Sequence, residues 1–159
     1  MKQTDNFKFD EANVMNELVY RNLSEDAKRQ ICAWKYGGEY DLYNLPAYEE
    51  MQVRQIGFMN PKSEKNYYGF WDESILVGFV NILEEKEEVF IGIGVNPDFC
   101  NKHYGQRMLL ITYEISKKLY PNKPLYLEVR TWNIRAVKCY QKAGFRIDGQ
   151  AYELTTGIG

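Results

Sequence analysis

The sequence predicts one α/β domain built on a mixed, mostly antiparallel twisted sheet of about six or seven strands with about four flanking helices. Three strand-like runs between residues 67 and 95 alternate with short polar turns, which favours an antiparallel meander. The run at 89–95 leads through a polar loop into apolar residues spaced three and four apart, the pattern of an amphipathic helix. Another strand and helix follow at 125–143. A chain of 159 residues is long enough for one domain with a substantial core, which we expect over residues 17–159.

Charge and hydropathy limit the partners and the location of the protein. The formal net charge is −2, whereas proteins that bind nucleic acids normally carry a strongly basic surface, so we expect no nucleic-acid partner. The first residues lack the apolar core of a signal peptide, and nowhere do about 18 apolar residues run together. We therefore expect a cytoplasmic protein that has no membrane partner.

The cysteines and the histidine argue against a metal centre. Cys32, Cys100 and Cys139 do not have the spacing of metal ligands, and their odd number does not suggest a disulfide framework. The chain has one histidine, so a zinc site would need ligands that the sequence does not reveal. We expect no metal.

The first half of the chain predicts a strand and two short helices. Residues 1–16 are polar and weakly patterned, and a flexible lead-in and a short helix both remain open for them. A strand is expected at 18–23, and Ser24 then has the residue type of an N-cap for a helix that continues to about Lys35. A Gly-Gly pair and a proline break this helix before a second one at 49–57.

The second half is expected to hold most of the sheet and two further helices. The charged run at 84–88 is most simply a solvent-exposed hairpin tip. In chain order, the predicted elements are strands at 67–71, 75–83 and 89–95, a helix from about 105 to 119, a strand at 125–130, a helix at 134–143, and strands at 145–148 and 152–156.

The junction between the strand at 89–95 and the helix that begins near Gly105 is the most informative part of the sequence. Unpaired backbone amides and the positive end of the helix dipole face the same point at such a junction, which suits a phosphate or diphosphate. The loop has neither the Gly-Lys-Ser/Thr ending of a Walker loop nor the GxGxxG spacing of a dinucleotide-binding fold. A nucleotide bound in either of those ways is therefore not predicted.

The loop does resemble the coenzyme-binding signature of one family. VNPDFCNKHYG is similar to V-x-P-x-x-[QR]-x-x-G-x-[GA] of the GNAT superfamily of N-acetyltransferases. Val95, Pro97 and Gly105 match, whereas Cys100 replaces Arg or Gln and His103 replaces Gly. The histidine either weakens coenzyme binding, because a Cβ obstructs the approach of backbone to phosphate, or adds an imidazole donor. The sequence does not choose between these effects.

A second stretch resembles the other hallmark of this family. LYLEVRTWNIRAVKCYQKAGF is similar to a strand followed by N-x-x-A-x-x-x-Y-x-x-x-G-F, with matches at Asn133, Ala136, Tyr140, Gly144 and Phe145. Within the family, this segment is similar to that of ribosomal-protein N-terminal alanine acetyltransferases. The two motifs cover about the last two-fifths of the chain.

The resemblance implies a GNAT-like fold and an enzyme that transfers an acetyl group from acetyl-CoA directly to a primary amine without a metal. A homodimer is compatible with it. It implies that the strands at 89–95 and 125–130 splay apart after a bulge, for which Gly92 and Gly94 are candidates; the alternative is that these glycines pack tightly against a helix. The residues that would bind the coenzyme are Gly94, Val95, Cys100, Asn101, Lys102, His103, Tyr104, Gly105, Gln106 and Asn133.

The same resemblance implies the catalytic pair. Tyr140 stands where the family places the acid that protonates the leaving thiolate, whereas helical periodicity alone favours a core tyrosine. Glu128 stands where the base is found, and the alternative is an outward-facing strand glutamate paired with Arg130. Asn133 is either an N-cap or a contact for the pantetheine arm.

The acceptor is less defined than the donor. Residues 34–50 combine aromatic rings with carboxylates, which suits a cationic amine, although a surface loop whose aromatic rings pack on the sheet fits as well. A small cationic amine and a protein N-terminus both remain open. Two other hypotheses are a non-catalytic acyl-CoA-binding module of the same fold and, against the acidic balance, an RNA-binding domain. The aromatic and acidic residues of this segment are Trp34, Tyr36, Tyr40, Tyr43, Tyr48, Glu39, Asp41, Glu49 and Glu50.

Overall fold

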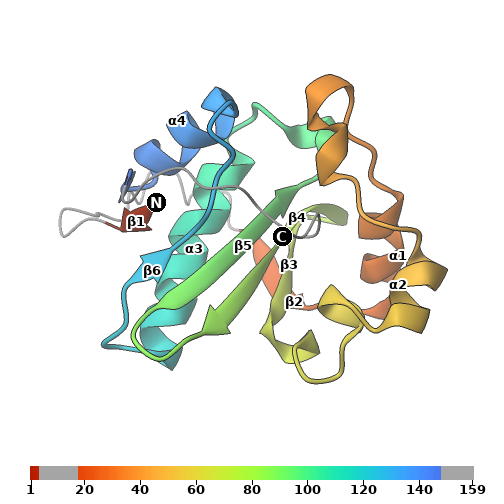
Figure 1. Ribbon diagram of the computed structural model, residues 1–159, viewed down its shortest axis with the longest axis horizontal. Helices are drawn as coiled ribbons and strands as arrows, with labels where there is room; N and C mark the ends of the chain where they lie inside the picture. Colours follow the sequence, from red (N-terminus) through yellow and green to blue (C-terminus); the bar gives the residue numbers. More distant parts are fainter. Residues whose placement is uncertain (4–17, 148–159) are drawn as a thin grey trace.

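The computed structural model describes residues 1–3 and 18–147, which form a sheet with helices on both faces (Figure 1). The strands are β1 (Lys2–Gln3), β2 (Val19–Asn22), β3 (Tyr67–Asp72), β4 (Ile75–Glu84), β5 (Val89–Val95), β6 (Leu125–Tyr126) and β7 (Phe145–Arg146). The α-helices are α1 (Glu25–Ala33), α2 (Tyr48–Arg54), α3 (Tyr104–Leu119) and α4 (Ile134–Lys142). Short 3-10 turns are η2 (Gly38–Tyr43), η3 (Gly57–Met59), η4 (Glu64–Asn66) and η5 (Pro97–Phe99).

The seven strands lie in the order β2-β3-β4-β5-β6-β1-β7, and three of them, β1, β6 and β7, are only two residues long. Every pairing is antiparallel except that of β5 with β6, which is parallel. The predicted mixed α/β class with a mostly antiparallel sheet is confirmed. Within the described ranges, no helix is both long and apolar enough to cross a membrane.

The antiparallel meander β3-β4-β5 is confirmed close to its predicted limits. β4 and β5 pair in continuous register from Gly78↔Val95 to Glu84↔Val89. The ladder between β3 and β4 has a register shift between Phe70 and Trp71, where Val77 is left without a direct partner. Side chains of a strand normally alternate between the two faces of the sheet, and the extra residue of the bulge interrupts this alternation along β4. Apolar side chains before and after the bulge can therefore both pack against the helices that cover the sheet.

The strand predicted at 125–130 is shorter than expected, because its ladder ends at Tyr126. The Leu127 backbone N–H donates to the Met1 carbonyl at 2.9 Å, and the Met1 amino group donates to the Leu127 carbonyl. Residues 1–3 therefore depart from the expected lead-in: β1 lies between β6 and β7. The β5–β6 ladder ends at Tyr126, and Leu127 pairs with Met1 on the side of β6 that faces away from β5.

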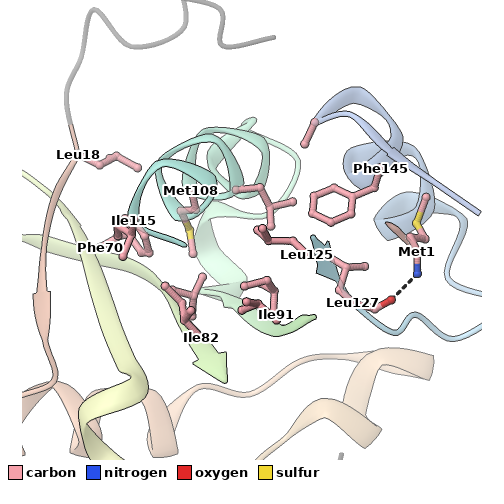
Figure 2. Packing of buried hydrophobic residues seen from close by; sticks show 14 of the residues in the cluster. Met1, Leu18, Phe70, Ile82, Ile91, Met108, Ile115, Leu125, Leu127 and Phe145 are labelled. Carbon is pink, nitrogen blue, oxygen red and sulfur yellow. Dashed lines mark hydrogen bonds between the residues drawn. The ribbon is translucent and has the colours of Figure 1, made fainter. Parts of the chain in front are cut away.

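Two apolar layers cover the sheet. One cluster joins α3 and the α4 region to the inner face of β4, β5 and β6, and Figure 2 shows Met108, Ile91 and Leu125 meeting in it. The other joins α1, α2 and η3 to residues such as Leu76, and Phe79 packs against its edge. The sheet therefore separates α1 and α2 from α3 and α4.

Helix limits differ from the predicted ones by a few residues at most. Ser24 caps α1 as predicted, its side chain accepting from the Ala27 N–H at 3.1 Å. Of the last two predicted strands, the first corresponds to β7, which is Phe145–Arg146. The second, at 152–156, lies outside the described residues.

Candidate active site

A gap opens between β5 and β6 after their second residue pair. The parallel ladder consists of Val89↔Leu125 and Phe90↔Tyr126, while β5 continues to Val95. The Val89 N–H donates to the Pro124 carbonyl on the β6 side, at 2.9 Å. Because alternate residues of a strand direct their backbone groups to the same side, those of Ile93 and Val95 face the space that β6 has left.

The predicted bulge at the two glycines is wrong. β5 keeps its register with β4 throughout, so the gap arises from the short β6 and not from a distortion of β5. A Cβ at Gly94 would lie 2.3 Å from the Phe79 ring, a distance that side-chain atoms do not tolerate. Gly94 is therefore needed for packing, against a neighbouring strand and not against a helix.

The loop after β5 brings the start of α3 to the end of this gap. Asn96 accepts from the Asp98 N–H at 3.0 Å, which begins the turn η5. Asn101 and His103 then adopt left-handed backbone conformations, with φ of 66° and 65°. His103 is the N-cap residue just before α3, and its side chain makes no capping hydrogen bond. The first N–H groups of a 16-residue helix thus point out of the loop without a side-chain cap.

Helix α4 packs across the start of α3. A Cβ at Gly105 would lie 3.1 Å from the Cys139 sulfur, so a side chain there would require the Cys139 thiol to shift by a few tenths of an ångström. The Gln106 amide donates to the Lys142 carbonyl at 3.4 Å. The two motif stretches are therefore in contact, as expected if they form one site.

The other predicted coenzyme-binding side chains differ in what they contact. The Cys100 thiol donates to the Asn96 carbonyl at 3.7 Å, and burial raises its pKa. The Lys102 ammonium lies 5.3 Å from the centre of the Phe99 ring and is exposed. The Tyr104 hydroxyl donates to Asp72 at 2.5 Å, which fixes the start of α3 to the end of β3.

Asn133 is the N-cap of α4, one of the two roles predicted for it. Its Oδ1 accepts from the Ala136 N–H at 3.1 Å, and its Nδ2 donates to the Tyr43 hydroxyl at 3.0 Å. The side chain is only 7% exposed. Both ends of this amide are thus already engaged, so a pantetheine contact would have to share or replace one of these bonds.

Tyr140 lies on α4 and packs against the core cluster that joins α3 and α4 to the sheet. Burial raises the pKa of Tyr140 above its ordinary value, and the neighbouring Cys139 and Tyr43 raise it further. The Arg135 guanidinium, five residues earlier in the chain, partly offsets these effects. The phenol therefore keeps its proton at neutral pH.

Glu128 lies on the opposite face of the sheet from Tyr140. The burial of the segment alternates, with Leu127 inside and Glu128 exposed. Tyr126, two residues earlier, contacts the Phe90 ring, with ring centres 5.5 Å apart, and Glu128 contributes to raising its pKa. Glu128 and Tyr140 thus lie on either side of the gap without a direct contact.

The aromatic residues of the predicted acceptor segment do not form one wall. Trp34 packs beside Phe79, and the Tyr48 hydroxyl donates to Glu25 at 2.5 Å, both on the α1 and α2 side. Tyr40 and Tyr43 instead contact the Trp132 ring, with centres 5.6 and 6.1 Å away.

Comparison with known sequences identifies the protein family to which the chain belongs. The sequence profile of the Acetyltransferase (GNAT) family matches residues 29–145. The chain belongs to this family. The match takes in both motif stretches and also the α1 and α2 region, which the motifs alone do not reach.

Relatives of known or assigned activity include polyamine acetyltransferases. A probable spermine N(1)-acetyltransferase of Bacillus subtilis subsp. natto is 31% identical over 99 residues, which are 55% of this GNAT chain and 65% of that protein. The match therefore spans slightly less than two-thirds of that relative.

Solved structures share the fold at lower identity. A spermidine N-acetyltransferase chimera from Vibrio cholerae and hSSAT has a TM-score of 0.70 at 20% identity, covering 84% of this chain and 82% of that one. The ribosomal-protein alanine N-acetyltransferase from Escherichia coli has a TM-score of 0.59 at 18% identity, covering 83% and 79%. At these identities the likeness concerns the GNAT fold.

Sequence reasoning missed two residues near the GNAT motifs, Arg135 and Trp132. The Arg135 guanidinium lies 4.2 Å from the centre of the Tyr40 ring, and Trp132 lies just before α4. Tyr36, assigned from the sequence to the acceptor segment, donates its hydroxyl hydrogen to the Val95 carbonyl at 2.5 Å, at the end of β5. Position 135 is a variable site of the motif, so only a contact between distant segments could have indicated it.

No metal site emerges from the described residues, among which no three histidine, cysteine, aspartate or glutamate side chains are grouped. The three cysteines are free. The metal-free reaction stays a prediction.

Proposed function

We propose that this GNAT protein transfers an acetyl group from acetyl-CoA directly to a primary amine, and that the acceptor is a polyamine. The observation that carries the proposal is the gap between β5 and β6, which ends at the uncapped start of α3. Backbone donors at a helix start suit the coenzyme diphosphate, and the free edge of β5 suits the amides of its pantetheine arm. The loop residues predicted to bind the coenzyme are proposed to line this path.

Tyr140 is proposed to supply the proton to the leaving group. When the amine nitrogen bonds to the thioester carbon and the carbon–sulfur bond breaks, the sulfur leaves with a negative charge and needs a proton. A raised pKa keeps that proton on Tyr140 until the thiolate forms. Burial also raises the pKa of the neighbouring Cys139 and Cys100 thiols, so a coenzyme sulfur in the same surroundings would be more basic than in water. This effect offsets the raised pKa of the phenol, which by itself would oppose proton transfer.

Glu128 is proposed to accept the amine proton, through water if the two groups do not touch. It is an exposed carboxylate on the face opposite Tyr140. Acid and base on opposite sides of the gap fit a direct transfer, in which the amine approaches from one side and the thiolate leaves toward the other.

A polyamine acceptor is supported by the relative and by the charge of the acceptor segment. The similar Bacillus protein is named for spermine. Glu39 and Asp41 are exposed between α1 and α2, and Glu49 and Glu50 are exposed in the first turn of α2. A group of carboxylates raises the local concentration of a multiply charged cation.

The test is an acetyl-transfer assay with purified protein, acetyl-CoA and a panel of amines. The panel contains spermine, spermidine, an aminoglycoside and a peptide with an N-terminal alanine, and release of the free coenzyme thiol is followed. We expect turnover with spermine or spermidine at a kcat/KM at least about tenfold above that of the peptide. Preference for the peptide would reject the polyamine, and turnover with none would reject the enzyme.

A non-catalytic acyl-CoA-binding protein is the second candidate. Cys100 lacks the side chain that the motif usually has, and His103 carries a Cβ in a left-handed position. Such a protein would bind acetyl-CoA but would not depend on the Tyr140 hydroxyl.

A further inference from the structure

Two buried side-chain oxygens in the described part of the chain have no hydrogen-bond partner: Oδ1 of Asn81 in β4 and Oγ of Ser116 in α3. An unpaired buried acceptor is costly and calls for an explanation. Ser116 is completely buried, where no ligand has access. Asn81 is different, because its residue as a whole is partly exposed.

Asn81 points to the face of the sheet that carries α1 and α2. It pairs directly with Tyr67 of β3 and with Gly92 of β5, and directly paired residues share a face. Phe79, two residues earlier on β4, packs against the α1 and α2 cluster. The amide therefore lies on the face opposite α3 and α4.

A side chain could be added at Gly92 without displacing its neighbours. A Cβ at Gly92 would make only ordinary contacts, 3.5 Å from the Asn81 Cβ and 3.6 Å from the Phe90 ring. At Gly94, by contrast, a Cβ would lie 2.3 Å from the Phe79 ring. Packing thus does not require glycine at position 92, and a small added group fits there beside the Asn81 side chain.

The same face carries the proposed base. Phe90 lies two residues before Gly92 in β5, and its ring contacts the Tyr126 ring across the ladder. Glu128 lies two residues beyond Tyr126, on the same side of the segment. An unpaired amide oxygen, an open position and a carboxylate therefore share one face at the β5–β6 gap.

We propose that the Asn81 amide oxygen accepts a hydrogen bond from an N–H of the acceptor amine and so holds it near Glu128. This inference rests on the proposed acetyl transfer and names a residue that binds the acceptor. A polyamine suits the site because its chain carries N–H groups in addition to the one that reacts. Binding would give the buried oxygen the partner that it lacks, so the cost of leaving it unpaired is recovered when the substrate is present.

The test uses Asn81→Leu, which keeps the shape of the side chain and removes its hydrogen-bonding atoms. With acetyl-CoA saturating and spermine varied, we expect KM for spermine to rise about fivefold to tenfold, the loss of one hydrogen bond. The melting temperature should stay the same or increase, because the substitution removes an unpaired buried oxygen. Asn81→Asp retains an acceptor oxygen and should bring KM back toward that of the parent chain.

Ser116→Ala is the matched control, since it removes the other unpaired oxygen. It should not lower the melting temperature and should leave KM for spermine unchanged. If Asn81→Leu leaves KM unchanged in a chain that acetylates spermine, the inference is overturned and the proposed function stands. A clear fall in melting temperature for Asn81→Leu would also overturn it, because the oxygen would then have a structural partner such as water. A parent chain that acetylates no amine overturns both.

Discussion

The Asn133 side-chain amide donates to the Tyr43 hydroxyl at 3.0 Å and thereby ties the start of α4 to the segment between α1 and α2. The two residues are 90 positions apart in the sequence. Because α4 also carries Tyr140, this bond connects the proposed acid to the segment proposed to meet the acceptor.

Removing the Tyr43 hydroxyl should therefore destabilise the fold. Tyr43→Phe leaves the nearly buried Asn133 Nδ2 without its acceptor, and we expect the free energy of unfolding to fall by about 1–2 kcal/mol. Urea denaturation measures this change. Tyr40→Phe is the control, since Tyr40 meets Trp132 and Arg135 through its ring, and its effect should stay within about 0.5 kcal/mol. Equal effects of the two substitutions would contradict the structural role of the bond.

Replacing Tyr140 by Phe should slow turnover without weakening coenzyme binding. Loss of a general acid typically lowers kcat by about 10²–10⁴-fold, whereas the ring and its packing remain. Steady-state kinetics and a calorimetric titration with acetyl-CoA measure the two quantities separately. Tyr120→Phe, at the far end of α3, should change neither. Unchanged turnover in Tyr140→Phe would exclude this residue as the acid.

Glycine at position 103 should stabilise the loop. His103 has φ of 65° and ψ of 10°, which costs a residue with a Cβ about 1 kcal/mol. His103→Gly should thus raise the free energy of unfolding by about 0.5–1 kcal/mol and, by clearing the helix start, tighten acetyl-CoA binding. Asn101→Gly should gain less, because asparagine tolerates this conformation.

His103→Ala separates the two effects predicted for the histidine. It removes the imidazole but keeps the Cβ and the strain. If the imidazole contacts the diphosphate, both the Ala and the Gly variants will bind acetyl-CoA more weakly than the parent chain, contrary to our expectation for His103→Gly.

The buried ammonium of Lys28 should make stability sensitive to Glu64. Lys28 is 2% exposed and donates to Glu25 at 3.1 Å and to Glu64 at 3.0 Å, which links α1 to η4. Burial acts to lower the pKa of Lys28, but the hydrogen bonds to Glu64 and Glu25 outweigh it, and the net pKa is raised. Glu64→Gln should therefore cost about 1–3 kcal/mol at pH 7.

The pH dependence has a definite sign. Since the folded pKa of Lys28 is raised, the stabilisation is fully present below the unfolded pKa of about 10.4 and is lost as the pH rises through the folded value. Urea denaturation between about pH 7 and 11 should show the parent chain losing its advantage over Glu64→Gln at the alkaline end. Glu50→Gln, whose partner Arg54 is exposed, is the control and should cost less than about 0.5 kcal/mol.

The parts of the site that lie close together in the sequence could be predicted. The strand, loop and helix around Val95 and Gly105 follow from periodicity and turn residues, and the structure places them as expected. The left-handed backbone at His103 explains why the family motif has glycine there, whereas the sequence alone suggested only an obstruction to phosphate.

Contacts between distant segments could not be predicted. Tyr36 reaches Val95 across 59 positions, and a sequence pattern gives the period of an element but not which remote side chains meet. The pairing of β6 with β1 is a second example: Met1 and Leu127 exchange backbone hydrogen bonds, although no pattern in residues 1–16 indicated a strand.

Calorimetric titration with acetyl-CoA tests most directly whether the start of α3 and the free edge of β5 form a coenzyme site. We predict that one molecule binds per chain, and that at about 100 times Kd the melting temperature rises by roughly 5–10 °C. Neither heat nor a rise in melting temperature at millimolar acetyl-CoA would contradict the account.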